Sequence, residues 1–103
     1  MQEQYKILPL VNNKEQQRFE LEVDGYTAFI EYKESGKQVI LIHTEVPEEL
    51  EGKGVGTAIV EKTLEHIESN QQTLVPLCPF VIAFLKRHPD WNRLLSDSVK
   101  KDQ

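Results

Sequence analysis

Apolar and polar residues alternate along the middle of the chain with the period of a β-strand. Apolar residues occupy every second position from 19 to 23, with glutamates between them. Asp24-Gly25 follows, a dipeptide typical of a two-residue hairpin turn. The pattern therefore predicts a strand up to Val23, a hairpin, and a second strand over residues 26–33. Residues 34–37 include Gly36 and predict another turn.

A third strand is predicted over residues 38–46, and both of its faces are apolar until its last residues. Strict alternation places Val39, Leu41, His43 and Glu45 on one face and Ile40, Ile42, Thr44 and Val46 on the other. A strand that is apolar on both faces is typical of the middle of a sheet. We therefore expect this strand to be central.

The period then changes to that of a helix. An amphipathic helix is predicted over residues 54–70 from its apolar side, which comprises Val55, Ile59, Thr63, Leu64 and Ile67. A short strand over residues 73–77 follows. A second helix begins at Pro79 and ends before His88-Pro89. The predicted fold class is α+β, with an antiparallel three-stranded meander, a crossover helix, a fourth strand and a second helix.

The ends of the chain and one early segment have little apolar pattern. Residues 12–17, Asn-Asn-Lys-Glu-Gln-Gln, predict a turn, because Asn tolerates the conformations that turns require. We expect one domain over residues 1–103, with residues 1–6 and 97–103 disordered. A chain of 103 residues is too short to bury two independent cores.

The charge argues against nucleic-acid binding. Twelve Lys and Arg against seventeen Asp and Glu give a net charge of -5, the wrong sign for neutralising phosphates along a nucleic acid. The acidic excess lies in residues 1–50, which hold five basic and ten acidic residues, whereas residues 51–103 hold seven of each. An anionic ligand is therefore expected in the second half.

Other features bear on where the protein acts. The longest apolar stretch, residues 74–85, is interrupted by two prolines and is shorter than the roughly 20 residues that span a bilayer. The N-terminus has no secretory pattern, and Cys78 is the single cysteine. We expect a cytoplasmic protein, a monomer or a weak dimer, with no membrane contact. No second Cys or paired His lies at ligand spacing, so no metal is expected.

The segment with the most distinctive chemistry is Leu50-Glu51-Gly52-Lys53-Gly54-Val55-Gly56-Thr57, between the third strand and the long helix. Glycines let the backbone approach a ligand closely, and the free N–H groups of a helix N-terminus attract anions. The spacing differs from that of a Walker phosphate loop and from the dinucleotide fingerprint. The segment predicts a phosphate or pyrophosphate site, or alternatively a tight structural turn.

This segment resembles the pyrophosphate turn of the GCN5-related N-acetyltransferase superfamily, Gln/Arg-x-x-Gly-x-Gly/Ala, which it matches at Gly54 and Gly56. Glu51 departs from that pattern. The chain as a whole is similar to the small, single-domain branch often called YjdJ-type. This likeness is carried by residues 19–25, 30–32, 43–47, 51–56 and 75–89. The branch lacks the first helices of its larger relatives, so the resemblance implies a truncated acetyltransferase-like fold.

The resemblance also implies a site for acetyl-coenzyme A as a substrate, with an unidentified amine as the acceptor. By analogy, Val46 pairs with the pantetheine through its backbone, and the amides of Lys53, Gly54, Val55, Gly56 and Thr57 hold the pyrophosphate. Lys86 and Arg87 form a basic cluster with His88 that would suit a 3'-phosphate. The same cations would also be favourable at the C-terminus of a helix without any ligand.

Transfer of an acetyl group to an amine needs a base for the ammonium proton. His43 and Glu45 are the candidates, since both project from one face at the end of the third strand, where superfamily members commonly place a catalytic carboxylate. The alternative is that they form a hydrogen-bonded pair at the sheet rim.

Cys78 is the third catalytic candidate. It precedes Pro79 and is predicted to be the N-cap of the second helix, where free N–H groups favour a thiolate. It would act as a nucleophile that carries the acetyl group or as the acid that protonates departing coenzyme A. Its alternative role is that of a small buried apolar side chain.

The resemblance thus implies an acetyl-coenzyme A-dependent N-acetyltransferase. Two alternatives stay open. One is a module that binds coenzyme A without turnover, as Glu51 and the missing acceptor-side helices suggest. The other is a protein-interaction domain in which the glycine turn is structural.

Overall fold

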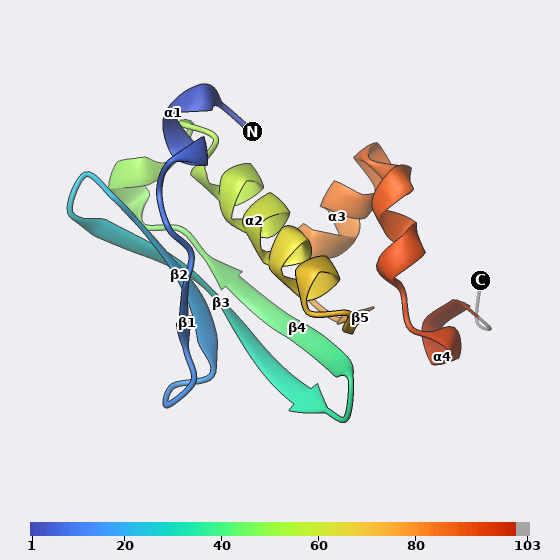
Figure 1. The fold of residues 1–103 in the computed structure, drawn as a ribbon. Helices are drawn as coiled ribbons and strands as arrows, with labels where there is room; N and C mark the ends of the chain where they lie inside the picture. Colours follow the sequence, from blue (N-terminus) through green and yellow to red (C-terminus); the bar gives the residue numbers. More distant parts are fainter. Residues whose placement is uncertain (101–103) are drawn as a thin grey trace.

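The computed structural model describes residues 1–100, which fold as a twisted sheet with helices against one face (Figure 1). The helices, 3-10 helices (η) and strands follow in this order: α1 Glu3–Lys6, β1 Val11–Asn13, β2 Arg18–Val23, β3 Tyr26–Ser35, β4 Gln38–Glu45, η1 Glu48–Leu50, α2 Val55–Ser69, β5 Thr73–Pro76, α3 Pro79–Arg87, η2 Pro89–Leu94 and α4 Asp97–Lys100. The predicted α+β class is confirmed.

The sheet follows chain order, β1-β2-β3-β4-β5. The first four strands pair antiparallel, whereas β5 pairs parallel to β4 and is reached through α2, the predicted crossover helix. Asp24 and Gly25 have φ of 51° and 83°, the two positive values that a type I′ hairpin turn requires. The hairpin prediction is therefore confirmed.

The core lies between the sheet and α2. Helix α2 contributes fully buried side chains that repeat at helical spacing: Val55, Ala58, Ile59, Val60, Thr63, Leu64 and Ile67. The sheet contributes alternate residues of its strands, among them Phe19, Leu21, Ile30 and Leu41, each at most 1% exposed. The strand residues between these are exposed or half-buried, so the other face of the sheet is open.

A β-bulge interrupts the pairing of β3 and β4. Glu31 pairs with His43, but the next residue, Tyr32, pairs with Leu41, so Ile42 is an extra residue in β4. Because side chains alternate between faces, one extra residue moves every later side chain to the opposite face. Thr44 therefore joins Leu41 on the helix-covered face.

This bulge corrects the strict alternation that we expected along β4. His43 and Glu45 still share a face, as predicted, but it is the open face of the sheet rather than the face of Val39 and Leu41. The hydrophobic pattern did not contain this information, since both faces of β4 are apolar before the bulge. Pairing with the longer β3 strand decides where the extra residue is accommodated.

Strand β1 corrects the predicted turn over residues 12–17. Asn12 and Asn13 pair with β2, and the Tyr32 hydroxyl donates a hydrogen bond of 2.5 Å to Asn12 Oδ1. The turn comprises residues 14–17, so it starts two residues later than predicted, and Asn13 Oδ1 accepts a hydrogen bond from the Gln16 amide. An edge strand leaves one side of its backbone in water, so polar residues are tolerated there.

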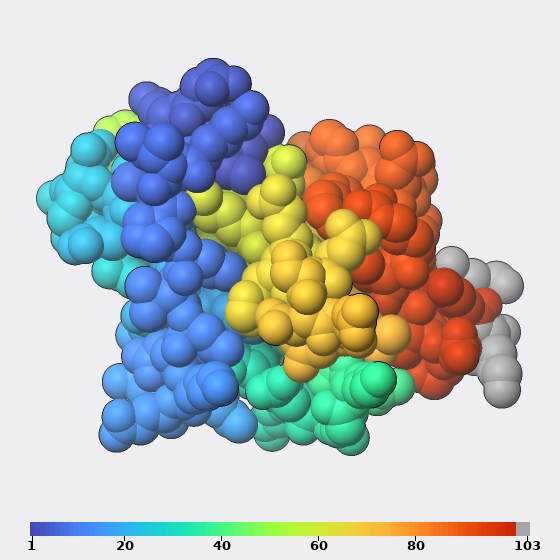
Figure 2. All heavy atoms as spheres, viewed as in Figure 1, coloured from blue at the N-terminus to red at the C-terminus, as the bar shows by residue number. Residues whose placement is uncertain are grey.

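The N-terminal segment, which we expected to be disordered, forms α1 and packs against α2 (Figure 2). Tyr5 is only 3% exposed, and its hydroxyl donates a hydrogen bond of 2.7 Å to the Lys53 carbonyl. Lys62 Nζ donates to the Leu8 carbonyl at 2.7 Å. The buried Tyr5 ring and these two hydrogen bonds to the rest of the protein thus order this segment.

The C-terminal segment also differs from the expectation over the residues that the structure describes. Asp97–Lys100 form α4, directly after Ser96, whose amide donates a hydrogen bond of 3.0 Å to the Leu74 carbonyl. Ser96 is 2% exposed and so anchors the start of this turn. Residues 101–103 of the predicted disordered tail lie outside the described residues.

Within residues 1–100, no helix is both long and apolar enough to cross a bilayer.

Candidate functional site

The glycine turn is held in place by its flanks. On one side Leu50 is 1% exposed, and on the other Val55 is fully buried at the start of α2. The backbone between them needs two left-handed residues, Gly52 at φ 76° and Gly54 at φ 79°. Gly54 is the N-cap of α2, and no side chain caps the helix there. The first amides of α2 therefore have no side-chain acceptor and are available to an anion.

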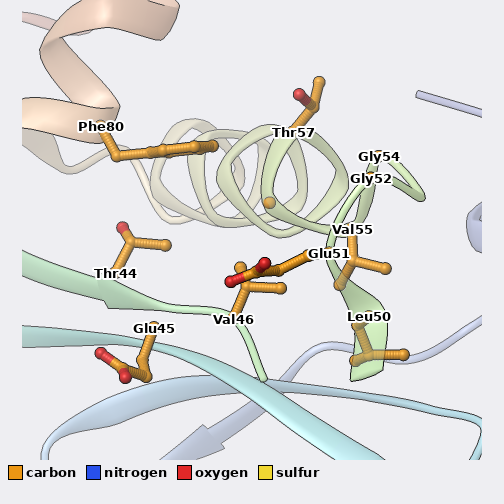
Figure 3. Close-up of a pocket in the computed structure, with 11 residues that line it drawn as sticks. Thr44, Glu45, Val46, Leu50, Glu51, Gly52, Gly54, Val55, Thr57 and Phe80 are labelled. Carbon is orange, nitrogen blue, oxygen red and sulfur yellow. The ribbon is translucent and has the colours of Figure 1, made fainter. Parts of the chain in front are cut away.

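A cleft of about 460 Å³ opens beside this turn, between the end of β4 and the first turn of α2 (Figure 3). Its walls come from β4, the glycine turn, α2 and α3. The residues that line it are Thr44, Glu45, Val46, Leu50, Glu51, Gly52, Gly54, Val55, Gly56, Thr57 and Phe80. The cleft thus joins the helix N-terminus to the end of the central strand.

Six residues singled out in the sequence come together in this cleft: Glu45, Val46, Gly54, Val55, Gly56 and Thr57. Five others, His43, Lys53, Cys78, Lys86 and Arg87, are not among the residues that line it. The sequence reasoning did not select Thr44 or Phe80 as site residues. The sequence indicated these two residues only indirectly, because each lies one or two positions from a residue that was selected.

Three of the residues outside the cleft are cationic, namely Lys53, Lys86 and Arg87, and they lie on other parts of the surface. Lys53 borders a neighbouring cavity beneath α1, together with Gln2, Tyr5 and Asp24. Lys86 and Arg87 are in the last turn of α3, whereas Phe80 is in its first turn, and seven residues of helix separate Phe80 from Arg87 by about 10 Å. The structure therefore does not bring this basic cluster to the cleft.

His43 and Glu45 form a pair on the open face of the sheet. His43 Nε2 lies 2.6 Å from Glu45 Oε2, and the two side chains are 53% and 55% exposed. Glu45 lies at the rim, because it also lines the cleft, whereas His43 faces Glu31 across the strands. His43 and Glu45 thus form the hydrogen-bonded pair at the sheet rim that was the alternative to a catalytic role. The Glu45 carboxylate nevertheless also borders the cleft.

Cys78 is the N-cap residue of α3, as predicted, and Pro79 is the first helical residue. Its sulfur, however, makes no cap hydrogen bond to the helix. Instead, Sγ lies 3.3 Å from the Thr44 hydroxyl, and the residue is 2% exposed. This corrects the expectation that the sulfur would lie over the free amides of the helix. The reason is the β4 bulge, which turns Thr44 toward the helices and offers the thiol a partner.

Glu51 is the acidic residue of the glycine turn, and it lines the cleft together with Glu45 of β4. Figure 3 shows its side chain extending between β4 and α2, on the side of Val46. It occupies the motif position where the resemblance expects Gln or Arg. The site therefore combines helix amides that attract an anion with a carboxylate on the glycine turn that repels it.

Within residues 1–100, no three side chains of His, Cys, Asp or Glu lie close enough together to hold a metal ion.

Comparison with known proteins gives two findings. A family model described as "GCN5-related N-acetyl-transferase" matches residues 18–94, which include the cleft and both of its helices. Among solved structures, the solution NMR structure of a GCN5-like protein from Staphylococcus aureus superposes with a TM-score of 0.66. The two chains are 23% identical, and the match covers 86% of this chain and 88% of the other, which shows a shared fold.

Proposed function

The chain belongs to the GCN5-related N-acetyltransferase family, and from this membership we propose that it transfers an acetyl group from acetyl-coenzyme A to the amine of an acceptor. The observation that carries the proposal is the cleft, which leads from the uncapped N-terminus of α2 to the end of β4. A cytoplasmic location also belongs to this proposal.

The coenzyme would lie along this cleft. Its pyrophosphate would accept hydrogen bonds from the amides of Gly54 to Thr57, where the helix dipole also favours negative charge. The pantetheine would run beside Val46 and end near Thr44. Lys86 and Arg87 have no part in this arrangement, because they lie at the far end of α3.

Glu45 is the proposed general base. The acceptor would approach from the open face of the sheet, where Glu45 borders the cleft, and the carboxylate would take a proton from its ammonium group. The neutral amine nitrogen then attacks the thioester carbonyl, the C–S bond breaks, and coenzyme A leaves as a thiolate. The nitrogen, which becomes cationic on attack, gives its second proton to water and so becomes the amide nitrogen. His43 would orient the carboxylate through their 2.6 Å contact.

Direct transfer is the proposed route, because Cys78 is buried and does not line the cleft. The thiol would instead act with the Thr44 hydroxyl as the proton donor for departing coenzyme A. A thiolate is a good leaving group, since ordinary thiols ionise near pH 8.5. Acid catalysis at this step is therefore worth little.

The test of the proposed function has two parts. Titration with coenzyme A measures binding, and release of free thiol from acetyl-coenzyme A with a panel of amines measures transfer. Binding without release would make the protein a coenzyme-binding module, and the absence of both would leave the glycine turn a structural feature.

The Cys78 prediction concerns the route of transfer. Incubation with acetyl-coenzyme A in the absence of an amine should leave Cys78 unacetylated by mass spectrometry. The Cys78→Ala variant should lose less than about tenfold in turnover, because a thiolate leaves without much acid assistance. A stable acetyl group on Cys78, together with an inactive Ala variant, would contradict direct transfer and make Cys78 the nucleophile.

The Glu51 prediction concerns the cofactor site. Replacing Glu51 with Gln should tighten coenzyme A binding by about five- to tenfold, because a unit charge a few ångströms away in a water-like medium costs about 1 kcal/mol. The effect should shrink as salt is raised, since ions screen the repulsion.

The matched control for this variant is Glu49→Gln, which removes the same charge from an exposed residue two positions earlier that does not line the cleft. Its affinity should stay at the wild-type value. Equal gains in the two variants would mean that net charge, and not the cleft, controls binding.

A further inference from the structure

Phe80 closes one end of the cleft. It is the second residue of α3, two positions after Cys78, and the ring reaches from α3 across to the first turn of α2. Figure 3 shows the ring extending from α3 to α2 above Thr44, at the end of the cleft opposite Leu50 and Gly52. The side chain is 42% exposed.

Gly56 creates the space for this ring. A Cβ placed on Gly56 would lie 2.7 Å from Phe80 Cζ, and its three nearest neighbours would all be atoms of that ring. Unlike Gly52 and Gly54, Gly56 lies within the helix and has no positive φ. The backbone does not require glycine at this position, and alanine is the better helix former. A side chain at position 56 would therefore have to displace the Phe80 ring.

The closed end is where the acyl group would lie. This step rests on the proposed function, in which the pyrophosphate lies on the turn and the pantetheine runs past Val46 toward Thr44. A thioester at Thr44 would then carry its acyl chain toward the Phe80 ring, since the two residues line the same end of the cleft. Each added methylene would have to displace the ring or leave the cleft.

We infer that Phe80, seated against Gly56, limits the acyl group that the cleft accepts to the size of acetyl. Phe80 is a specificity-determining residue, because its ring shapes the space around the acyl chain and takes no part in proton transfer. The arrangement has two components, and each can be changed separately.

The experiment is a binding titration with free, acetyl-, propionyl- and butyryl-coenzyme A. In the wild type, affinity should fall by about tenfold for each methylene beyond acetyl, the lower end of what one methylene is worth in a fitted apolar pocket. In Phe80→Ala the affinities of the acetyl and butyryl forms should converge, because the ring no longer blocks the chain. Free coenzyme A should bind both proteins alike.

Two further variants sharpen the test. Gly56→Ala keeps the ring but pushes it away from α2 toward Thr44, so acetyl-coenzyme A should weaken relative to free coenzyme A. Ile82→Ala removes another partly exposed apolar side chain from α3, one that borders a different cavity, and should keep the wild-type order of affinities.

The outcomes separate this inference from the proposed function. Failure of free coenzyme A to bind the wild type would overturn the proposed function, and this inference with it. Binding of free coenzyme A with equal wild-type affinities for all acyl lengths, or an unchanged order in Phe80→Ala, would overturn the role of Phe80 alone.

Discussion

Glu45→Gln should lower the turnover of acetyl transfer by about 10²- to 10⁴-fold, the usual contribution of a positioned general base. Glutamine keeps the size and polarity of the side chain but cannot accept the proton of an ammonium group. Affinity for coenzyme A should stay near the wild-type value, because the proposed contacts of the coenzyme are backbone amides. Thiol release and a coenzyme titration on the same preparation measure the two quantities.

The control for this variant is Glu22→Gln, which removes one carboxylate from an exposed position on β2 and leaves the rim of the cleft intact. Its turnover should match the wild type. His43→Asn should have a smaller effect than Glu45→Gln, because it removes the partner of the base and not the base itself. Parallel losses of turnover and coenzyme affinity in Glu45→Gln would assign the carboxylate a structural role.

Phe19→Ala should cost about 3–5 kcal/mol of unfolding free energy, the range for removing a large buried aromatic side chain. Phe19 is 1% exposed on the helix-covered face of β2. Its ring stacks on Tyr32 with centroids 4.3 Å apart and meets His66 of α2 edge-on at 5.2 Å. The substitution would leave a cavity between the sheet and α2. Denaturant-induced unfolding followed by circular dichroism measures the loss.

Phe29→Ala is the matched control, because it removes the same side chain from the open face of the neighbouring strand. Phe29 is only half-buried, and Arg18 lies over its ring at 4.3 Å. The expected cost is about 1 kcal/mol, chiefly the lost cation–π contact. Similar losses in the two variants would mean that the open face is covered in solution, contrary to the layer order described above.

The regular elements of this protein were predictable because their signals are local. Each signal lies within a short stretch of sequence: the alternation over residues 19–23, the Asp24-Gly25 turn, and the helical spacing from Val55 to Ile67. The crossover from β4 to β5 follows from element order alone. The position of the glycine turn was also predictable, because three glycines at alternate positions between a predicted strand and a predicted helix indicate a turn.

The elements that were missed depend on distant partners. Asn12 joins a strand because β2 and the Tyr32 hydroxyl are beside it, although its own propensity favours a turn. Tyr5 orders the N-terminal segment through the carbonyl of Lys53, which is 48 positions away. Neither partner can be identified from the residues around these positions, so a prediction from local pattern assigns both segments to loops or disorder.

The sequence by itself determined the fold class, the order of the elements and the place of the glycine turn, because periodicity and turn chemistry act over short stretches of chain. The tertiary structure decided which candidates share the cleft. The β-bulge opposite Glu31 and Tyr32 places the Thr44 side chain beside Cys78 and the His43 side chain on the open face. The packing of α3 against α2 places Phe80 against Gly56. Both depend on the register between strands and the packing between helices, which arise only when residues far apart in the sequence meet.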